Sequence, residues 1–146
     1  MRKFTSRMIS VCLGAIAVNI VACSNIGPSL EGTAWRLVSY NQEPVVAEPM
    51  ITAEFMAGQL TGLAGCNRYF GSYTLTEGEL TIEDTAATEK FCLAPEGIMA
   101  QEEAYLALIR QAQTYGVEGD ALTISTSDGD LVFTVAEYVT GAKSSL

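Results

Sequence analysis

Histidine is absent from this 146-residue chain, and basic side chains are few. Without histidine, the chain lacks the usual general base of nucleophilic triads and the commonest metal ligand. Lysine and arginine together number 8, against 17 aspartates and glutamates. That excess of negative charge disfavours binding to nucleic acid. The Gly-Lys-Ser/Thr signature of a phosphate-binding loop is also missing. The sequence therefore predicts no catalytic residue, no metal site, no cofactor and no nucleic-acid partner.

Cysteine is scarce as well, and none of the 4 cysteines has the Cys-x-x-Cys spacing of zinc and redox sites. Cys12 lies in the apolar N-terminal run and Cys23 directly after it, both within an expected export signal described below. Cys66 and Cys92 are therefore the two cysteines of the domain and can pair. Metal ligation or a catalytic thiol would need further partners, histidine above all. We expect a Cys66–Cys92 disulfide, whose loop of about 26 residues would contribute on the order of 3 kcal/mol.

The N-terminus has the order of a secretory signal. Residues 1–7 are basic, residues 8–22 are largely apolar and uncharged, and Cys23 follows small residues. The run is shorter than the roughly 20 apolar residues that a membrane span needs. Ile20-Val21-Ala22-Cys23 resembles a bacterial lipobox, which implies cleavage after residue 22 and a lipid on Cys23. An ordinary signal peptide cut near Ala22, with Cys23 incidental, is the alternative.

Cleavage at that point leaves 124 residues with a formal charge of −12, enough for one ordinary domain. We expect a signal peptide at 1–22, a tether at 23–29, one domain at 30–138 and a tail at 139–146. The sequence predicts a monomer that the lipid on Cys23 attaches to the membrane of a bacterial envelope. Ser24 after the cysteine, with the likeness to Gram-negative lipoproteins, favours the outer membrane, facing the periplasm.

Short alternating segments between turn residues predict a mostly antiparallel β fold. Strands are expected at 32–40, 51–55, 59–62, 71–76, 80–83, 115–117, 121–124 and 131–135. One amphipathic helix is expected from Glu96 to about Gln113, because apolar residues such as Tyr105 and Ile109 recur there at helical spacing. The pattern predicts a β-rich α+β domain, a small antiparallel barrel-like sheet with the helix packed on it or plugging it.

Gly65-Cys66-Asn67-Arg68-Tyr69-Phe70-Gly71-Ser72-Tyr73 is the most distinctive stretch of the chain. Its glycines allow a tight, irregular turn around Cys66-Asn67, and its aromatic residues supply apolar area. Asn67 and Arg68 are the best polar candidates for a binding site. The alternative is a purely structural role, in which they cap the turn and pair with an acidic residue.

Acidic pairs elsewhere are weaker candidates for chemistry. Asp128-Gly129-Asp130 lacks the other ligands of a calcium loop and predicts a hairpin turn. Glu83 and Asp84 are neighbours in an expected strand, so their side chains point to opposite faces. Glu102 and Glu103 lie on different sides of the expected helix.

Four segments together resemble the META domain family, which includes heat-inducible HslJ-type lipoproteins of bacterial envelopes. They are Gly32-Thr33-Ala34-Trp35-Arg36-Leu37, the stretch 65–73, the segment 85–92 and Glu103-Ala104-Tyr105-Leu106-Ala107-Leu108. The resemblance covers about residues 30–136 and implies a small β-rich domain with a helix. It also implies a role in envelope stress or antibiotic tolerance, and offers no catalytic residue. One departure is Lys90, where the family often has methionine before the second cysteine.

Three functions remain open at this point. The first is a non-enzymatic accessory module that binds an envelope protein or stabilises the envelope under stress. The second is an inhibitor of a cationic muramidase such as lysozyme, which the acidic surface would attract. The third is a carrier that holds an apolar ligand inside the barrel.

Overall fold

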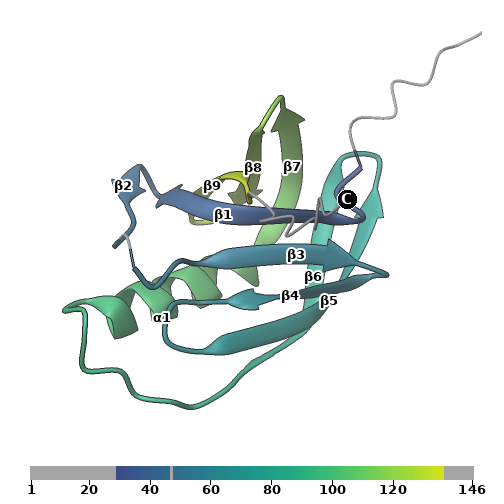
Figure 1. The fold of residues 1–146 in the computed structure, drawn as a ribbon. Helices are drawn as coiled ribbons and strands as arrows, with labels where there is room; N and C mark the ends of the chain where they lie inside the picture. The colour runs from purple at the N-terminus through teal and green to yellow at the C-terminus, as the bar shows by residue number, and fades with distance from the viewer. Residues whose placement is uncertain (1–28, 47, 137–146) are drawn as a thin grey trace, which may run out of the picture.

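The computed structural model describes residues 29–46 and 48–136. The predicted signal peptide, the lipid on Cys23, nearly all of the predicted tether and the predicted tail at 139–146 lie outside the described residues. The described part forms nine strands and one helix (Figure 1). In chain order these are β1 (Thr33–Tyr40), β2 (Glu43–Pro44), β3 (Thr52–Met56), β4 (Gln59–Leu63), β5 (Arg68–Thr76), β6 (Glu79–Ala87), α1 (Ile98–Ile109), β7 (Ala112–Glu118), β8 (Ala121–Thr126) and β9 (Gly129–Val135).

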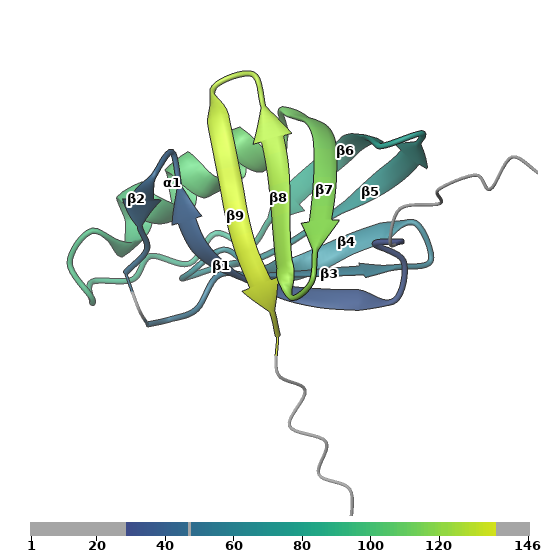
Figure 2. The same ribbon diagram turned by 90° about the horizontal axis from the view of Figure 1, so that it is seen from above.

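Eight of the strands close into an antiparallel barrel. Their order is β1-β3-β4-β5-β6-β7-β8-β9, and β1 pairs again with β9, where Leu37 lies opposite Phe133. The short β2 adds to the other edge of β1 through Tyr40 and Glu43. Figures 1 and 2 show the barrel from two sides, with α1 beside one end. The predicted fold class, a small antiparallel barrel with one helix, is confirmed.

The barrel is weakest between β6 and β7. A single pair of residues, Glu79 and Thr114, lies in register there, and the Tyr115 N–H donates to the Gly78 carbonyl at 3.1 Å. The two strands are separated in the chain by α1, whose Tyr105 ring packs against Tyr69 and against Phe133 of β9. The helix therefore plugs the barrel instead of lying on its outer surface.

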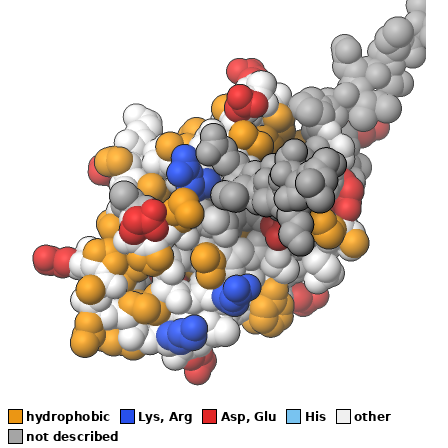
Figure 3. Space-filling view, viewed as in Figure 1, with side chains coloured by type: hydrophobic (Ala, Val, Ile, Leu, Met, Phe, Trp, Pro, Cys, Tyr) orange, Lys and Arg blue, Asp and Glu red, His pale blue; other side chains and the backbone are white. Residues whose placement is uncertain are grey.

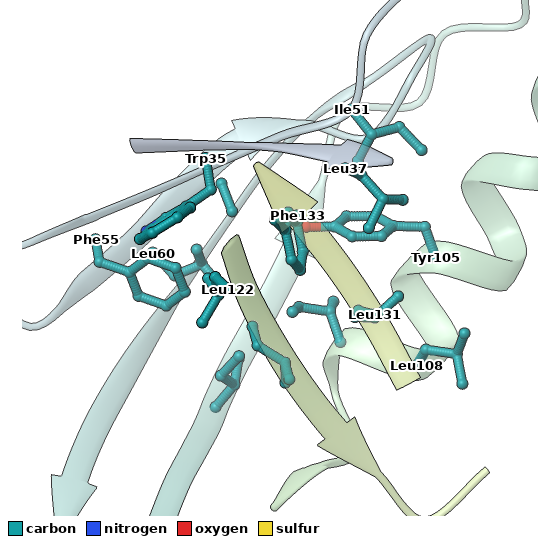
Figure 4. Packing of buried hydrophobic residues seen from close by; sticks show 14 of the residues in the cluster. Trp35, Leu37, Ile51, Phe55, Leu60, Tyr105, Leu108, Leu122, Leu131 and Phe133 are labelled. Atoms are coloured by element: carbon teal, nitrogen blue, oxygen red, sulfur yellow. The ribbon is translucent and has the colours of Figure 1, made fainter. Parts of the chain in front are cut away.

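The interior of the barrel is filled with side chains. Inward positions alternate along each strand as the sequence predicted, for example Trp35 and Leu37 on β1 (Figure 4). The ring centroids of Tyr69 and Tyr105 lie 5.4 Å apart, and their hydroxyls are hydrogen-bonded at 2.5 Å. Burial raises the pKa of both hydroxyls above the ordinary value. An apolar ligand inside the barrel would have to displace this packed core.

Several predicted boundaries were wrong: β7, β8 and β9 are longer than expected, and the short β2 was not predicted. The helix starts at Ile98 instead of Glu96, because Gly97 at φ +84° serves as its N-cap, and residue 112 already belongs to β7. β5 begins at Arg68 instead of Gly71, so most of the distinctive stretch is strand. β6 continues past Glu83 to Ala87 through a register shift opposite Gly71, where a Cβ would lie 2.9 Å from the Glu83 carbonyl oxygen.

Candidate functional site

The turn between β4 and β5 is tied covalently to the segment before α1. Cys66 and Cys92 form a disulfide with Cα atoms 5.9 Å apart, as the sequence predicted. The bridge spans 26 residues and fixes the loop that follows β6 against the start of β5. The two residues after Cys66, which the sequence singled out as binding candidates, differ sharply in their surroundings.

Asn67 is buried, with 2% of its surface exposed, and all of its side-chain polar atoms are hydrogen-bonded. Its backbone N–H donates to Glu102 Oε2 at 2.6 Å, and its Nδ2 donates to Glu102 Oε1 at 2.6 Å. Nδ2 also donates to the Lys90 carbonyl at 3.0 Å. Oδ1 accepts from Thr88 Oγ1 at 2.8 Å and from the Lys90 N–H at 2.7 Å. Asn67 thus joins the turn, the 88–90 segment and α1.

Glu102 completes this network, a role that we did not predict from its place beside Glu103. It lies on the same side of α1 as Ile98 and Tyr105, since residues three and four apart share a helix face. Only 5% of its surface is exposed. The helix approaches the turn closely because Gly65 has no side chain: a Cβ there would lie 2.9 Å from Ile98 Cδ1. Its position among apolar residues is the signal that could have identified it.

Arg68 is exposed, in contrast to Asn67. Its backbone is paired with Thr88, whose N–H donates to the Arg68 carbonyl at 2.9 Å. Its side chain borders a surface hollow of about 390 Å³ with Thr52, Thr61 and Leu63 on the outer side of the barrel. Arg68 therefore remains the candidate for contact with a partner, while the geometry assigns Asn67 to the fold.

A second polar cluster fixes the start of the domain. Leu30 is fully buried, and Glu31 accepts hydrogen bonds from the Ala57 N–H at 2.5 Å and from the Tyr73 hydroxyl. The Tyr73 bond, followed by the Ala57 bond, lowers the pKa of Glu31 below its usual value. Burial, followed by the bond to Glu31, raises the pKa of Tyr73 to about 12. The point where the preceding chain leaves the domain is therefore held in place.

The remaining acidic candidates do not converge on a site. Asp128 lies in the β8–β9 turn and Asp130 on β9, and Glu83 and Asp84 are exposed on β6. Within residues 29–46 and 48–136, no group of three or more acidic, cysteine or histidine side chains is arranged to hold a metal ion. A helix long and apolar enough to cross a membrane is not found among those residues either.

The chain is similar in sequence to one protein family and in fold to several solved structures. A family model for the META domain matches residues 28–138. An NMR structure of a protein from Burkholderia xenovorans is similar with 28% identity and a TM-score of 0.61, over 75% of this chain and 85% of that one. A second NMR structure has 24% identity and a TM-score of 0.58, over 71% of this chain and 89% of that one. A crystal structure of a DUF4847 family protein from Bacteroides vulgatus has 13% identity and a TM-score of 0.50, over 70% and 92%. No curated protein matches the chain.

Proposed function

The chain belongs to the META domain family, and from that membership we propose that it is a non-enzymatic, lipid-anchored protein of the bacterial cell envelope. In this proposal it is an accessory module in envelope stress or antibiotic tolerance, and the lipid on Cys23 attaches it to the outer membrane, facing the periplasm. The basic and apolar N-terminal order that precedes Cys23 supports the anchor.

The proposal rests on how Asn67, the polar residue at the centre of the 65–73 stretch, is hydrogen-bonded. The side chain of Asn67 is fully hydrogen-bonded within the protein, to Glu102, Lys90 and Thr88. Both Asn67 and Glu102 are buried. A catalytic or ligand-binding centre needs polar groups that face the substrate. A buried network of this kind instead stabilises a rigid domain, whose outer surface is then available for contacts in the envelope.

The two other functions considered from the sequence receive less support. A carrier would need interior space, and the barrel interior is occupied by packed aromatic and aliphatic side chains. An inhibitor of a cationic muramidase would rest on the acidic charge alone. Titration of lysozyme activity with the purified protein separates this function from the proposal. Inhibition near an equimolar ratio would favour the inhibitor over the accessory module. Full lysozyme activity at a large excess of the protein would favour the accessory module.

Replacement of the cysteine proposed to carry the lipid tests the anchor. Cys23→Ala should abolish lipid attachment and move the protein out of the detergent phase, or leave it as an uncleaved precursor. Cys12→Ala is the matched control, since it removes a cysteine from the signal sequence without touching the lipobox. Unchanged detergent partitioning of Cys23→Ala would contradict the proposal.

The stress role is tested in the host that encodes the protein. Cells lacking the gene should lose viability under heat or an envelope-active antibiotic, and the wild-type gene should restore it. A Cys23→Ala gene should fail to restore viability although the domain folds. Equal survival of the deletion strain and its parent across those conditions would reject the stress role and leave the anchor untouched.

A further inference from the structure

The few basic side chains of the domain are distributed unevenly. The described residues include four of them, Arg36, Arg68, Lys90 and Arg110, against 16 acidic ones. Strands β6 to β9 carry five acidic residues and no basic one, namely Glu79, Glu83, Asp84, Glu118 and Asp130. Strands β1, β3, β4 and β5 carry two arginines and a single acid, Glu54. One half of the barrel wall is therefore acidic, and the other half is weakly basic.

The two arginines lie in one row across the outer side of the basic half. Arg36 is in register with Thr52 of β3, and Leu63 is in register with Arg68 of β5. The Leu63 N–H donates to Thr52 Oγ1 at 3.0 Å, which connects the two pairs across β3 and β4. Three strand spacings put the arginine backbones about 14 Å apart. Both side chains are exposed, so they form the two ends of a solvent-facing row.

The backbone of Lys90 lies beside the start of β5, and both Lys90 and its neighbour Glu89 are exposed. Thr88 continues the pairing next to Arg68, and the Lys90 backbone is bonded to Asn67 on both its N–H and its carbonyl. We call the outer surface of β1, β3, β4 and β5, together with Lys90, the basic face; Glu54, on the same side of β3 as Thr52, is the single acid of these four strands. Arg110 is the remaining described cation; it lies at the C-terminal end of α1 and borders Glu103 and Leu106 instead.

The basic face is also unusually apolar for an exposed surface. Phe70 follows Arg68 by two residues, points to the same side of β5 and is 52% exposed. Met56, which lies on the same outward side of β3 as Thr52, is also 52% exposed. Figure 3 shows basic and hydrophobic side chains together on this side, with acidic ones both at the margins and near the upper basic group. Large apolar side chains exposed beside one another mark interaction surfaces.

We propose that the basic face lies against the anionic surface of a phospholipid bilayer. Cations attract anionic headgroups, and phenylalanine inserts at the boundary between headgroups and acyl chains. An anionic membrane repels the acidic half of the barrel, so the charge distribution selects one orientation. The inference rests on the proposed lipid anchor, which keeps the domain near a membrane.

The position of the tether agrees with this orientation. Residues 24–29 can span at most about 20 Å when fully extended. The tether joins the domain at Leu30 and Glu31, directly before β1, and the Gly32 N–H donates to the Phe55 carbonyl of β3 at 2.7 Å. The attachment point therefore lies at the ends of β1 and β3, two strands of the basic face, and a short tether can leave that face parallel to the membrane.

The orientation is tested by tryptophan fluorescence in vesicles that contain a brominated, quenching lipid. The processed full-length protein is incorporated into vesicles of phosphatidylcholine with or without phosphatidylglycerol. Phe70→Trp reports on the basic face and Ala121→Trp on the acidic half, while the buried Trp35 contributes equally to both. We expect severalfold stronger quenching of Phe70→Trp than of Ala121→Trp, and only when phosphatidylglycerol is present.

Charge variants decide whether the cations cause the orientation. Adding Arg36→Glu and Arg68→Glu to Phe70→Trp should remove the excess quenching, since each cation near an anionic surface favours contact roughly fivefold. Arg110→Glu is the matched control and should leave the excess unchanged. Equal quenching at the two tryptophan positions overturns the inference and makes an acidic protein surface the better partner. A wild-type protein that does not float with the vesicles instead overturns the anchor itself.

Discussion

Glu102→Ala should remove a large share of the domain's stability without touching its surface. The Glu102 carboxyl group accepts two hydrogen bonds from Asn67, both at 2.6 Å, and is buried. A hydrogen bond to a charged group contributes about 1.5–3 kcal/mol. The variant also leaves two donors of Asn67 buried without this acceptor. We therefore expect the free energy of unfolding to fall by about 3–5 kcal/mol, out of the roughly 5–15 kcal/mol of a typical domain.

Glu103→Ala is the matched control, because Glu103 is the next residue on the same helix but is exposed. Its free energy of unfolding should change by no more than about 0.5 kcal/mol. Urea unfolding of the oxidised protein can be followed by the fluorescence of Trp35, which is buried and is the sole tryptophan. A Glu102→Ala variant within about 1 kcal/mol of Glu103→Ala would refute the claim that this network holds the turn to the helix.

Two further predictions concern the disulfide and the start of the domain. Thiol labelling of the processed protein should find Cys66 and Cys92 unreactive until it is reduced, and reduction should lower the free energy of unfolding by about 3 kcal/mol; two readily labelled thiols before reduction would contradict the bridge. The bonds from Tyr73 and Ala57 lower the pKa of Glu31, so they stabilise the fold above its ordinary pKa of 4.5 and this stabilisation is lost as the pH falls through the folded-state pKa. Glu31→Gln should flatten this acid limb, which urea midpoints on either side of pH 4.5 would reveal; identical slopes in the two proteins would refute it.

The barrel could be predicted because strand alternation exposes which residues face inward. Trp35 and Leu37 alternate with Arg36 and Val38, and the structure buries the first pair and exposes the second. The closure of the barrel by β1 and β9 could not be predicted. A pairing between strands this distant in sequence leaves no local pattern, because it depends on the twist of every strand between them.

The candidate site could be located from the sequence, but the roles within it could not be divided. The glycines and cysteine at 62–71 indicated a turn, and the turn is where the disulfide and the Asn67 network lie. Asn67 and Arg68 are adjacent polar residues with similar sequence signals, yet one is buried and the other exposed. Which residue faces α1 depends on Glu102, and a glutamate on a helix is expected to be exposed unless its buried partner is known.

Net charge was the least informative property of the sequence. A strongly negative total disfavours contact with anionic surfaces, and from it we predicted no nucleic-acid partner. The total conceals that β6 to β9 hold acids without bases, while Arg36 and Arg68 share one row across the neighbouring strands. That separation arises from strand order, which places residues 36 and 68 on the same side of the molecule.

The pairing of β1 with β9 also determines when, during synthesis, the domain can fold. During synthesis β1 emerges first, but the strand that completes its pairing begins at Gly129, about 90 residues after β1 ends at Tyr40. At the usual elongation rate of about 5–20 residues per second, β9 is synthesised several seconds after β1. The barrel cannot close on the ribosome before its last strand appears. For the proposed exported protein, a chain that reaches a translocation channel during synthesis would still be unfolded, and its barrel would close only after β9 has crossed.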